Sequence, residues 1–272
     1  MLLVASLWSL LFHARAARTH RESALFRLFR GRCFVVGTVI VCLGALCLLV
    51  DLGKPERFVL LFFRPHPTYL TFGTFVLTGL VAVAAFLSVV NSLYVPRIGA
   101  RVKFAAEVLC ALLSAAVMTY TGLFLQGLYA VAFWDTWLLP VLFVLSAVSM
   151  GLSGCLLVLT FMRDAWLLSE DVARMHGVHV VVLVLEALAL AAFLGTAAYG
   201  RGAAPSSLAL LMSEPLLSWF VAGVVLCGLA VPLCGEAMLL VRRIDRAVPL
   251  FDACCIAGGL ALRACIVLAG LH

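Results

Sequence analysis

The sequence contains few charged residues for its length. Of 272 residues, 12% are charged and 65% are hydrophobic, and the mean hydropathy is +1.19. Soluble domains carry about 25% charged residues, because most of their surface faces water. The composition therefore excludes a soluble domain and predicts an integral membrane protein.

Short segments of alternating hydrophobicity, which a membrane β-barrel requires at about ten residues each, are also missing. The apolar runs are close to the ~20 residues with which a helix crosses the hydrocarbon core. We therefore expect an all-α integral membrane protein with eight transmembrane helices in one polytopic domain, residues 1–272. The expected spans are 1–13 (partial), 33–50, 70–93, 104–126, 138–161, 177–199, 216–240 and 252–271.

The first apolar run, residues 1–13, is too short for a full span. As a helix it reaches about 20 Å at ~1.5 Å per residue. Positive charges follow it, whereas a signal peptide carries them before its apolar run. We expect it to be the last part of a truncated first helix whose beginning lies upstream of Met1.

Redox-cofactor motifs are missing as well. The ten cysteines form no CxxC pair and no CxxCH haem-attachment motif. All lie within or at the edge of apolar runs, where a free cysteine acts as a small hydrophobic residue. His176 and His179 lie near an aqueous end, and no two histidines face each other from mid-span positions. We expect no metal site, no intrinsic haem and no iron–sulfur cluster.

Positive charge is concentrated on one side of the predicted membrane. Fourteen of the 19 lysine and arginine residues fall in the odd-numbered loops between spans, and four fall in the even-numbered loops. Cytoplasmic loops carry such an excess, and dispersed basic residues of this kind do not indicate nucleic-acid binding. We predict a multi-pass protein of the cytoplasmic membrane. Both termini, and the loops at 51–69, 127–137 and 200–215, are expected on the outer side.

Two ionisable residues, Glu186 and Arg263, lie near the middle of predicted spans. A charge at that depth costs about 2.5–3.5 kcal/mol, so each needs a partner or a wet cavity. We expect them to pair, either as a buried ion pair that joins two helices or as part of a proton relay. Glu107 and Glu236 lie closer to cytoplasmic ends, where snorkelling or local pairing would account for them.

The stretch at 119–143 predicts a helical hairpin with its tip on the outer side. Tyr120 lies near the outer end of its helix, where a phenol either anchors at the interface or hydrogen-bonds a ligand headgroup. Trp134 and Trp137 are interpreted as interfacial anchors of the tip. The loop at 51–69 combines charges, aromatics and three prolines. It either docks a soluble partner or lies on the membrane interface.

Five segments together resemble the NrfD-like family of membrane anchor subunits, which includes the anchors of polysulfide reductase and of cytochrome-linked nitrite reductase. The segments are DLGKPERF at 51–58, LTFGTFVL at 70–77, TYTGLFL at 119–125, FWDTWLLPVLF at 133–143 and GGLALRACIVLAG at 258–270. They follow the family pattern in order and spacing over nearly the whole chain.

The resemblance implies two four-helix bundles and a subunit without a redox cofactor of its own. Such subunits bind menaquinol or ubiquinol near the outer face and pass its electrons to an iron–sulfur, ferredoxin-like subunit. That partner feeds a catalytic subunit, either a molybdopterin enzyme or a multihaem cytochrome. The chain by itself would then be a quinol-oxidising subunit and not a complete enzyme.

By this likeness, Tyr120 matches the tyrosine that donates a hydrogen bond to a quinone carbonyl. Asp51 and Arg57 match the family's charged outer loop, and they would shape the mouth of the site or the partner surface. His66 in the same loop is either a proton acceptor or a solvated loop residue. The sequence departs from the family at its first span, which in related proteins supplies polar residues to the quinone head. Either the true start lies upstream of Met1, or this protein builds its site differently.

A second hypothesis is a redox-inactive transporter or ion-translocating membrane protein, in which Glu186 and Arg263 are the translocation residues. Against it, the sequence shows no clear internal repeat and no matching pair of broken helices. A third hypothesis is a purely structural anchor that lacks a working quinone site.

Overall fold

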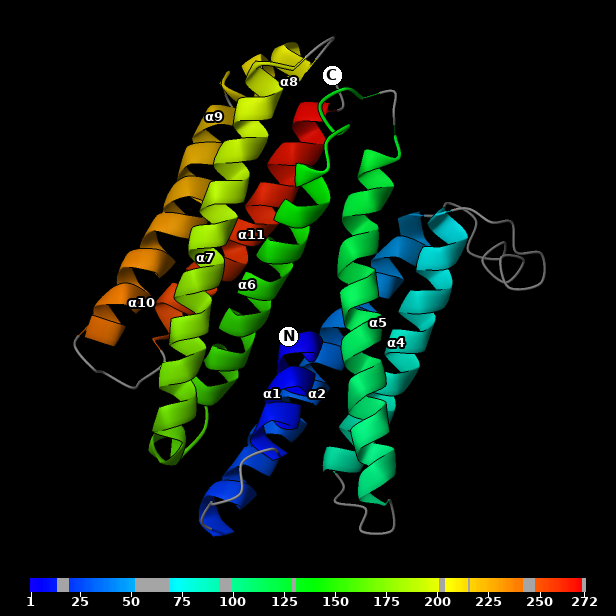
Figure 1. The fold of residues 1–272 in the computed structure, drawn as a ribbon, viewed down its shortest axis with the longest axis vertical. Coiled ribbons are helices and arrows are strands. Elements are labelled where there is room, and N and C mark those ends of the chain that lie inside the picture. Colours follow the sequence, from blue (N-terminus) through cyan, green and yellow to red (C-terminus); the bar gives the residue numbers. More distant parts are fainter. Residues whose placement is uncertain are drawn as a thin grey trace. The chain divides into compact units, whose positions relative to one another are not determined.

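The computed structural model describes residues 1–13, 20–51, 69–92, 99–128, 131–200, 204–214, 216–241 and 248–270. Throughout these ranges the regular secondary structure is helical, which confirms the predicted all-α class (Figure 1). The α-helices are α1 (Leu2–His13), α2 (His20–Asp51), α4 (Tyr69–Ser92), α5 (Ala100–Gln126), α6 (Leu138–Thr160), α7 (Ser169–Ala198), α8 (Ala204–Leu211), α9 (Leu216–Trp219), α10 (Val231–Val241) and α11 (Pro249–Gly270). A 3-10 helix, η2 (Ala165–Leu168), precedes α7, and a π-helix, η3 (Phe220–Ala230), joins α9 to α10.

Within the part of the chain that the structure describes, seven helical segments are long and apolar enough to cross a membrane. They are His20–Val50, Thr71–Ser92, Ala100–Gln126, Leu138–Thr160, Trp166–Ala198, Leu216–Val241 and Pro249–Gly270. Each overlaps one of the seven full spans expected from the sequence. The partial span at 1–13 is also a helix, with a shorter apolar part at Leu2–Leu11. Eight membrane crossings therefore remain a prediction.

Two helices begin well before the apolar residues that identified them. The span expected from residue 33 belongs to α2, which starts at His20, and the span expected from 177 belongs to α7, which starts at Ser169. The added residues include arginine and glutamate, which favour helix nearly as well as leucine does. Hydropathy locates where a helix crosses hydrocarbon, and it does not locate where that helix begins.

The chain divides into two compact units, unit 1 (Met1–Tyr120) and unit 2 (Thr121–His272). In unit 1, α2 packs against α1 and α4. In unit 2, α11 lies alongside α6 and η3, while α7 packs against α6 and α10 (Figure 1). Unit 1 also holds most of α5. Among the described residues, unit 1 therefore contains three membrane-length segments and the shorter apolar helix α1, and unit 2 contains four membrane-length segments.

Close backbone approach in unit 2 depends on two glycines, Gly228 in η3 and Gly258 in α11. A Cβ atom on Gly228 would lie 3.1 Å from the Cα of Gly258, and a Cβ on Gly258 would collide with the backbone of Gly228. Small residues permit such contact between membrane helices.

Pro232 follows η3 and has no amide hydrogen for the preceding carbonyls, and we attribute the wider π-helical turns to this loss.

The expectation that Trp134 anchors the hairpin tip at the interface is wrong. Its side chain is 4% exposed, and its Nε1–H donates to the carbonyl of Ile266 at 3.1 Å. The indole ring packs on Gly270, where a Cβ atom would collide with it. Trp137 is 76% exposed, as an interfacial anchor would be. Part of the tip therefore belongs to the apolar core of unit 2.

Candidate functional site

Tyr120 lies on α5, less than two turns before that helix ends at Gln126. Its side chain is half-buried against α4. A Cβ atom on Gly73 would lie 2.5 Å from Cε1 of the tyrosine ring, so only glycine leaves room for the phenol. The ring of Phe72 stands 6.5 Å from it, centroid to centroid, at 55°. The two segments LTFGTFVL and TYTGLFL therefore meet in space at Tyr120.

The predicted outer-loop residues are not placed by the structure. Arg57 and His66 lie outside the described residues. Asp51 is the last residue of α2, and the structure describes its backbone but not its side chain. Their assignment to the mouth of the site or to the partner surface stays a prediction.

Glu186 on α7 and Arg263 on α11 both lie inside unit 2 and interact electrostatically. Arg263 donates hydrogen bonds to the carbonyls of Phe143 and Gly259, each at 3.3 Å, and its guanidinium lies 5.5 Å from the Phe143 ring centroid. Glu186 is 6% exposed, and its Oε2 has no hydrogen-bond partner among the described residues. Between these two described side chains there is electrostatic attraction but no ion pair within 4.0 Å.

A buried polar cluster that the sequence did not reveal lies in unit 2, around His179 of α7. The imidazole Nδ1 and Oε1 of Glu236 on α10 are hydrogen-bonded at 2.5 Å. The other ring nitrogen, Nε2, lies 3.2 Å from the Ser149 hydroxyl and 3.4 Å from that of Ser153, both on α6. Asp252 of α11 completes the cluster at 1% exposure. Four helices thus contribute polar groups to one apolar interior.

This cluster corrects the expectation that snorkelling or local pairing accounts for Glu236. Glu236 is 1% exposed and faces α7, so snorkelling does not account for it. His179 is fully buried, although it lies near the end of its predicted span. The spacing His176-x-x-His179 places both rings on one helix face. This spacing was the one feature of the sequence that could have indicated the cluster. Their acidic partners come from helices far along the chain, which spacing cannot reveal.

A second buried network holds unit 1 together, with Arg30 of α2 at its centre. One guanidinium nitrogen of Arg30 donates to Glu107 of α5 and to Ser9 of α1, each at 2.9 Å, and the other donates to Asn91 of α4 at 2.8 Å. Ser9 also donates to Glu107 at 2.9 Å. Glu107 is therefore paired across helices and not locally. Through this network, four helices meet at a single arginine.

Comparison with known proteins decides the family of this protein. The model for "Polysulphide reductase, NrfD" matches residues 2–272. The chain belongs to the NrfD polysulphide reductase family. The C subunit of the polysulfide reductase of Wolinella succinogenes is 32% identical over 167 residues, which cover 60% of this chain and 53% of that protein. Protein NrfD of Escherichia coli is 27% identical over 261 residues, covering 87% and 80%.

The matched part of the chain thus spans about half the length of that polysulfide reductase subunit. No solved structure matches the chain. The resemblance inferred from five sequence segments is confirmed, and the chain is a membrane protein of the NrfD family with transmembrane helices.

The arginine network of this NrfD-family protein leads to a prediction about stability. Replacing Glu107 by alanine leaves Arg30 as an unpaired buried charge, which costs about 3–5 kcal/mol in free energy of unfolding. Denaturant unfolding of the detergent-solubilised chain measures this loss. Arg101→Ala, at an exposed position on the same helix, should change the value by less than about 0.5 kcal/mol. Equal stability of the two variants would contradict the role of the network.

Proposed function

We propose that this chain is the membrane anchor subunit of a respiratory oxidoreductase. It oxidises menaquinol or ubiquinol near the outer face and passes electrons to an iron–sulfur, ferredoxin-like partner. That partner supplies a catalytic subunit, a molybdopterin enzyme or a multihaem cytochrome. The observation that carries the proposal is the family match over residues 2–272. The packing of Tyr120 near the end of a membrane-length helix supports it.

Tyr120 is the proposed quinone-binding residue. Packing against Gly73 restricts the phenol ring, so its hydroxyl direction is set before a ligand arrives. A phenol donates one hydrogen bond to a quinone oxygen, worth about 0.5–1.5 kcal/mol. Preorganisation of this kind favours a ligand whose polar head is small and whose body is apolar, and a quinone has both features.

Oxidation of one quinol yields one quinone, two electrons and two protons. The sequence has no CxxC pair and no CxxCH motif to hold an electron acceptor. The electrons therefore pass to a cofactor in the partner, which docks on the outer loop at 51–69. Within that loop, Asp51, Arg57 and His66 shape the mouth of the site or the docking surface. The two protons leave toward the outer side or through internal acids.

The proposed arrangement is eight transmembrane helices in two four-helix bundles, with both termini on the outer side of the cytoplasmic membrane. Supporting it, the described residues of unit 1 hold three membrane-length segments and the shorter apolar helix α1, and those of unit 2 hold four such segments. The excess of lysine and arginine in the odd-numbered loops supports the orientation.

Glu186 and Arg263 are proposed to act together, as a buried electrostatic pair or as a proton relay. Their attraction supports the first role, because a charge in hydrocarbon needs a counter-charge. The unpartnered Oε2 of Glu186 supports the second, because a relay group needs a free acceptor. This acceptor also favours the second candidate function, a redox-inactive transporter. Co-purification distinguishes the two: the anchor retains quinone and an iron–sulfur partner, whereas the transporter moves solute alone.

Removal of the arginine tests both roles of that pair. Arg263→Ala should either lower the thermal stability of the complex or uncouple proton movement from quinol oxidation in proteoliposomes. Melting temperature and proton release per electron are the two measurements. Wild-type values for both would exclude Arg263 and Glu186 from either role.

Removal of the phenolic hydroxyl tests the quinone site. Tyr120→Phe should lower kcat/KM for quinol by about 2- to 10-fold, as expected for loss of one hydrogen bond. Assembly of the complex should be unaffected, because the ring is retained. Tyr199→Phe is the matched control, since Tyr199 is 93% exposed at the end of α7. Unchanged quinol oxidation in Tyr120→Phe would refute the assignment.

Displacement of the ring tests the same site from the opposite helix. Gly73→Ala forces a methyl group against the Tyr120 ring, so the phenol must move. Quinol oxidation should fall at least as far as in Tyr120→Phe. In Gly79→Ala, on the same helix, the new Cβ lies 3.6 Å from Leu113, an ordinary contact, and activity should persist. A folded Gly73→Ala protein with full activity would argue against ring placement as the determinant.

A further inference from the structure

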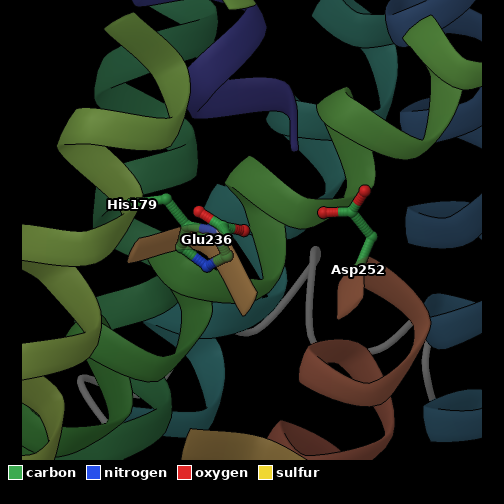
Figure 2. A group of neighbouring side chains, drawn as sticks. All are labelled: His179, Glu236 and Asp252. Atoms are coloured by element: carbon green, nitrogen blue, oxygen red, sulfur yellow. The ribbon is translucent and has the colours of Figure 1, made fainter. Parts of the chain in front are cut away.

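Three ionisable side chains of unit 2 converge from three helices, at His179 of α7, Glu236 of α10 and Asp252 of α11. One potential ligand atom from each lies within 4.8 Å of the others. Their exposures are 0%, 1% and 1%. Figure 2 shows the Glu236 carboxylate beside the imidazole of His179, with Asp252 reaching in from α11.

The hydrogen-bonding capacity of this cluster is incompletely used. Among the described residues, both carboxylate oxygens of Asp252 are buried without a hydrogen-bond partner. Oε2 of Glu236 makes one long ion-pair contact, to Nδ1 of the neighbouring His176 at 3.4 Å. A buried polar atom without a partner costs free energy, and an ionised carboxylate costs far more. These atoms indicate a ligand that accepts lone pairs.

The charge of the cluster gives the same indication. Glu236 and Asp252 together carry two negative charges when ionised. Among the described residues, the ion-pair partners of Glu236 are only His176 and His179, and Asp252 has none. A buried charge needs a counter-charge or a bound metal. One divalent cation would neutralise both carboxylates.

We propose that His179, Glu236 and Asp252 bind one divalent transition-metal ion. Imidazole with two carboxylates suits Zn²⁺ and its first-row neighbours, whereas Mg²⁺ and Ca²⁺ prefer oxygen ligands alone. The Ser149 and Ser153 hydroxyls lie beside Nε2 of His179, where they hold the ring as outer hydrogen-bond partners hold metal-bound histidines. This leaves Nδ1, which faces the Glu236 carboxylate, as the ligand nitrogen. The ion would take the place of the proton in that hydrogen bond.

The site is independent of the proposed quinone chemistry, because it shares no residue with the Tyr120 site. Its role is to hold α7, α10 and α11 together while cancelling buried charge. No local sequence motif indicates this site, because the three ligands lie far apart in the sequence. The expectation of no metal site rested on the lack of such motifs.

Metal content of the full chain tests the proposal. The protein is purified in detergent without a polyhistidine tag, stripped with a chelator, dialysed against micromolar Zn²⁺ and analysed by mass spectrometry of the metal. Wild type should retain one zinc per chain. Asp252→Asn and Glu236→Gln should bind zinc at least about tenfold more weakly, as ligand loss does. Glu170→Gln, which alters an exposed carboxylate on α7, should retain one equivalent.

Two further readouts apply where the variants fold poorly. Zinc should raise the melting temperature of the stripped wild-type protein, because a ligand that binds only the folded state stabilises it. Cobalt(II) in its place should give the visible spectrum of a nitrogen- and oxygen-coordinated low-symmetry site. Wild type without retained zinc, variants that retain it fully, or a spectrum of aqueous cobalt alone would each overturn the proposal. In the first case protons would neutralise the carboxylates instead.

Discussion

The cost of placing charge inside an apolar helical protein is the constraint on which this structure depends. In hydrocarbon a single ion costs several kcal/mol, so each buried ion draws partners from other helices. Arg30 does this in unit 1, where its guanidinium reaches side chains of α1, α4 and α5. The same requirement in unit 2 gathers His179, Glu236 and Asp252 from three helices. Polar contacts thus specify which helices are neighbours.

Small residues then determine how closely those neighbours approach. Helices in a membrane gain little from the hydrophobic effect, because lipid is as apolar as their side chains, and they associate through packing and hydrogen bonds. Gly228 and Gly258 allow η3 and α11 to touch along their backbones. Gly73 also permits a close contact because it lacks a side chain, but its neighbour is an aromatic ring and not the backbone of another helix. That ring belongs to Tyr120, the residue proposed to meet the quinone.

Hydropathy and segment pattern predicted the seven long spans and the family, because both depend on local composition and order. The buried networks could not be predicted in this way. Arg30 and Glu107 are 77 residues apart, and His179 and Glu236 are 57 apart, so their pairing follows from tertiary packing. The prediction for Trp134 was wrong for a related reason: an indole side chain is found both at the membrane interface and in the apolar core, and the sequence alone does not distinguish the two. For Tyr120 the sequence predicted the role, and the structure added Gly73 as the residue that makes room for it.

The proposed quinone chemistry uses few of these polar groups, since a neutral phenol suffices to orient a quinone. The carboxylates of unit 2 therefore need their own explanation, either protons or a metal ion. A proton on Asp252 would neutralise only one of the two carboxylates, whereas a divalent cation carries enough charge for both. Among the described residues, both oxygens of Asp252 lack a hydrogen-bond partner, and Oε2 of Glu236 has a long contact with His176 at 3.4 Å. A single cation can bind several of these oxygens at once. A single ligand that binds oxygens of both carboxylates thus favours the metal ion over protonation.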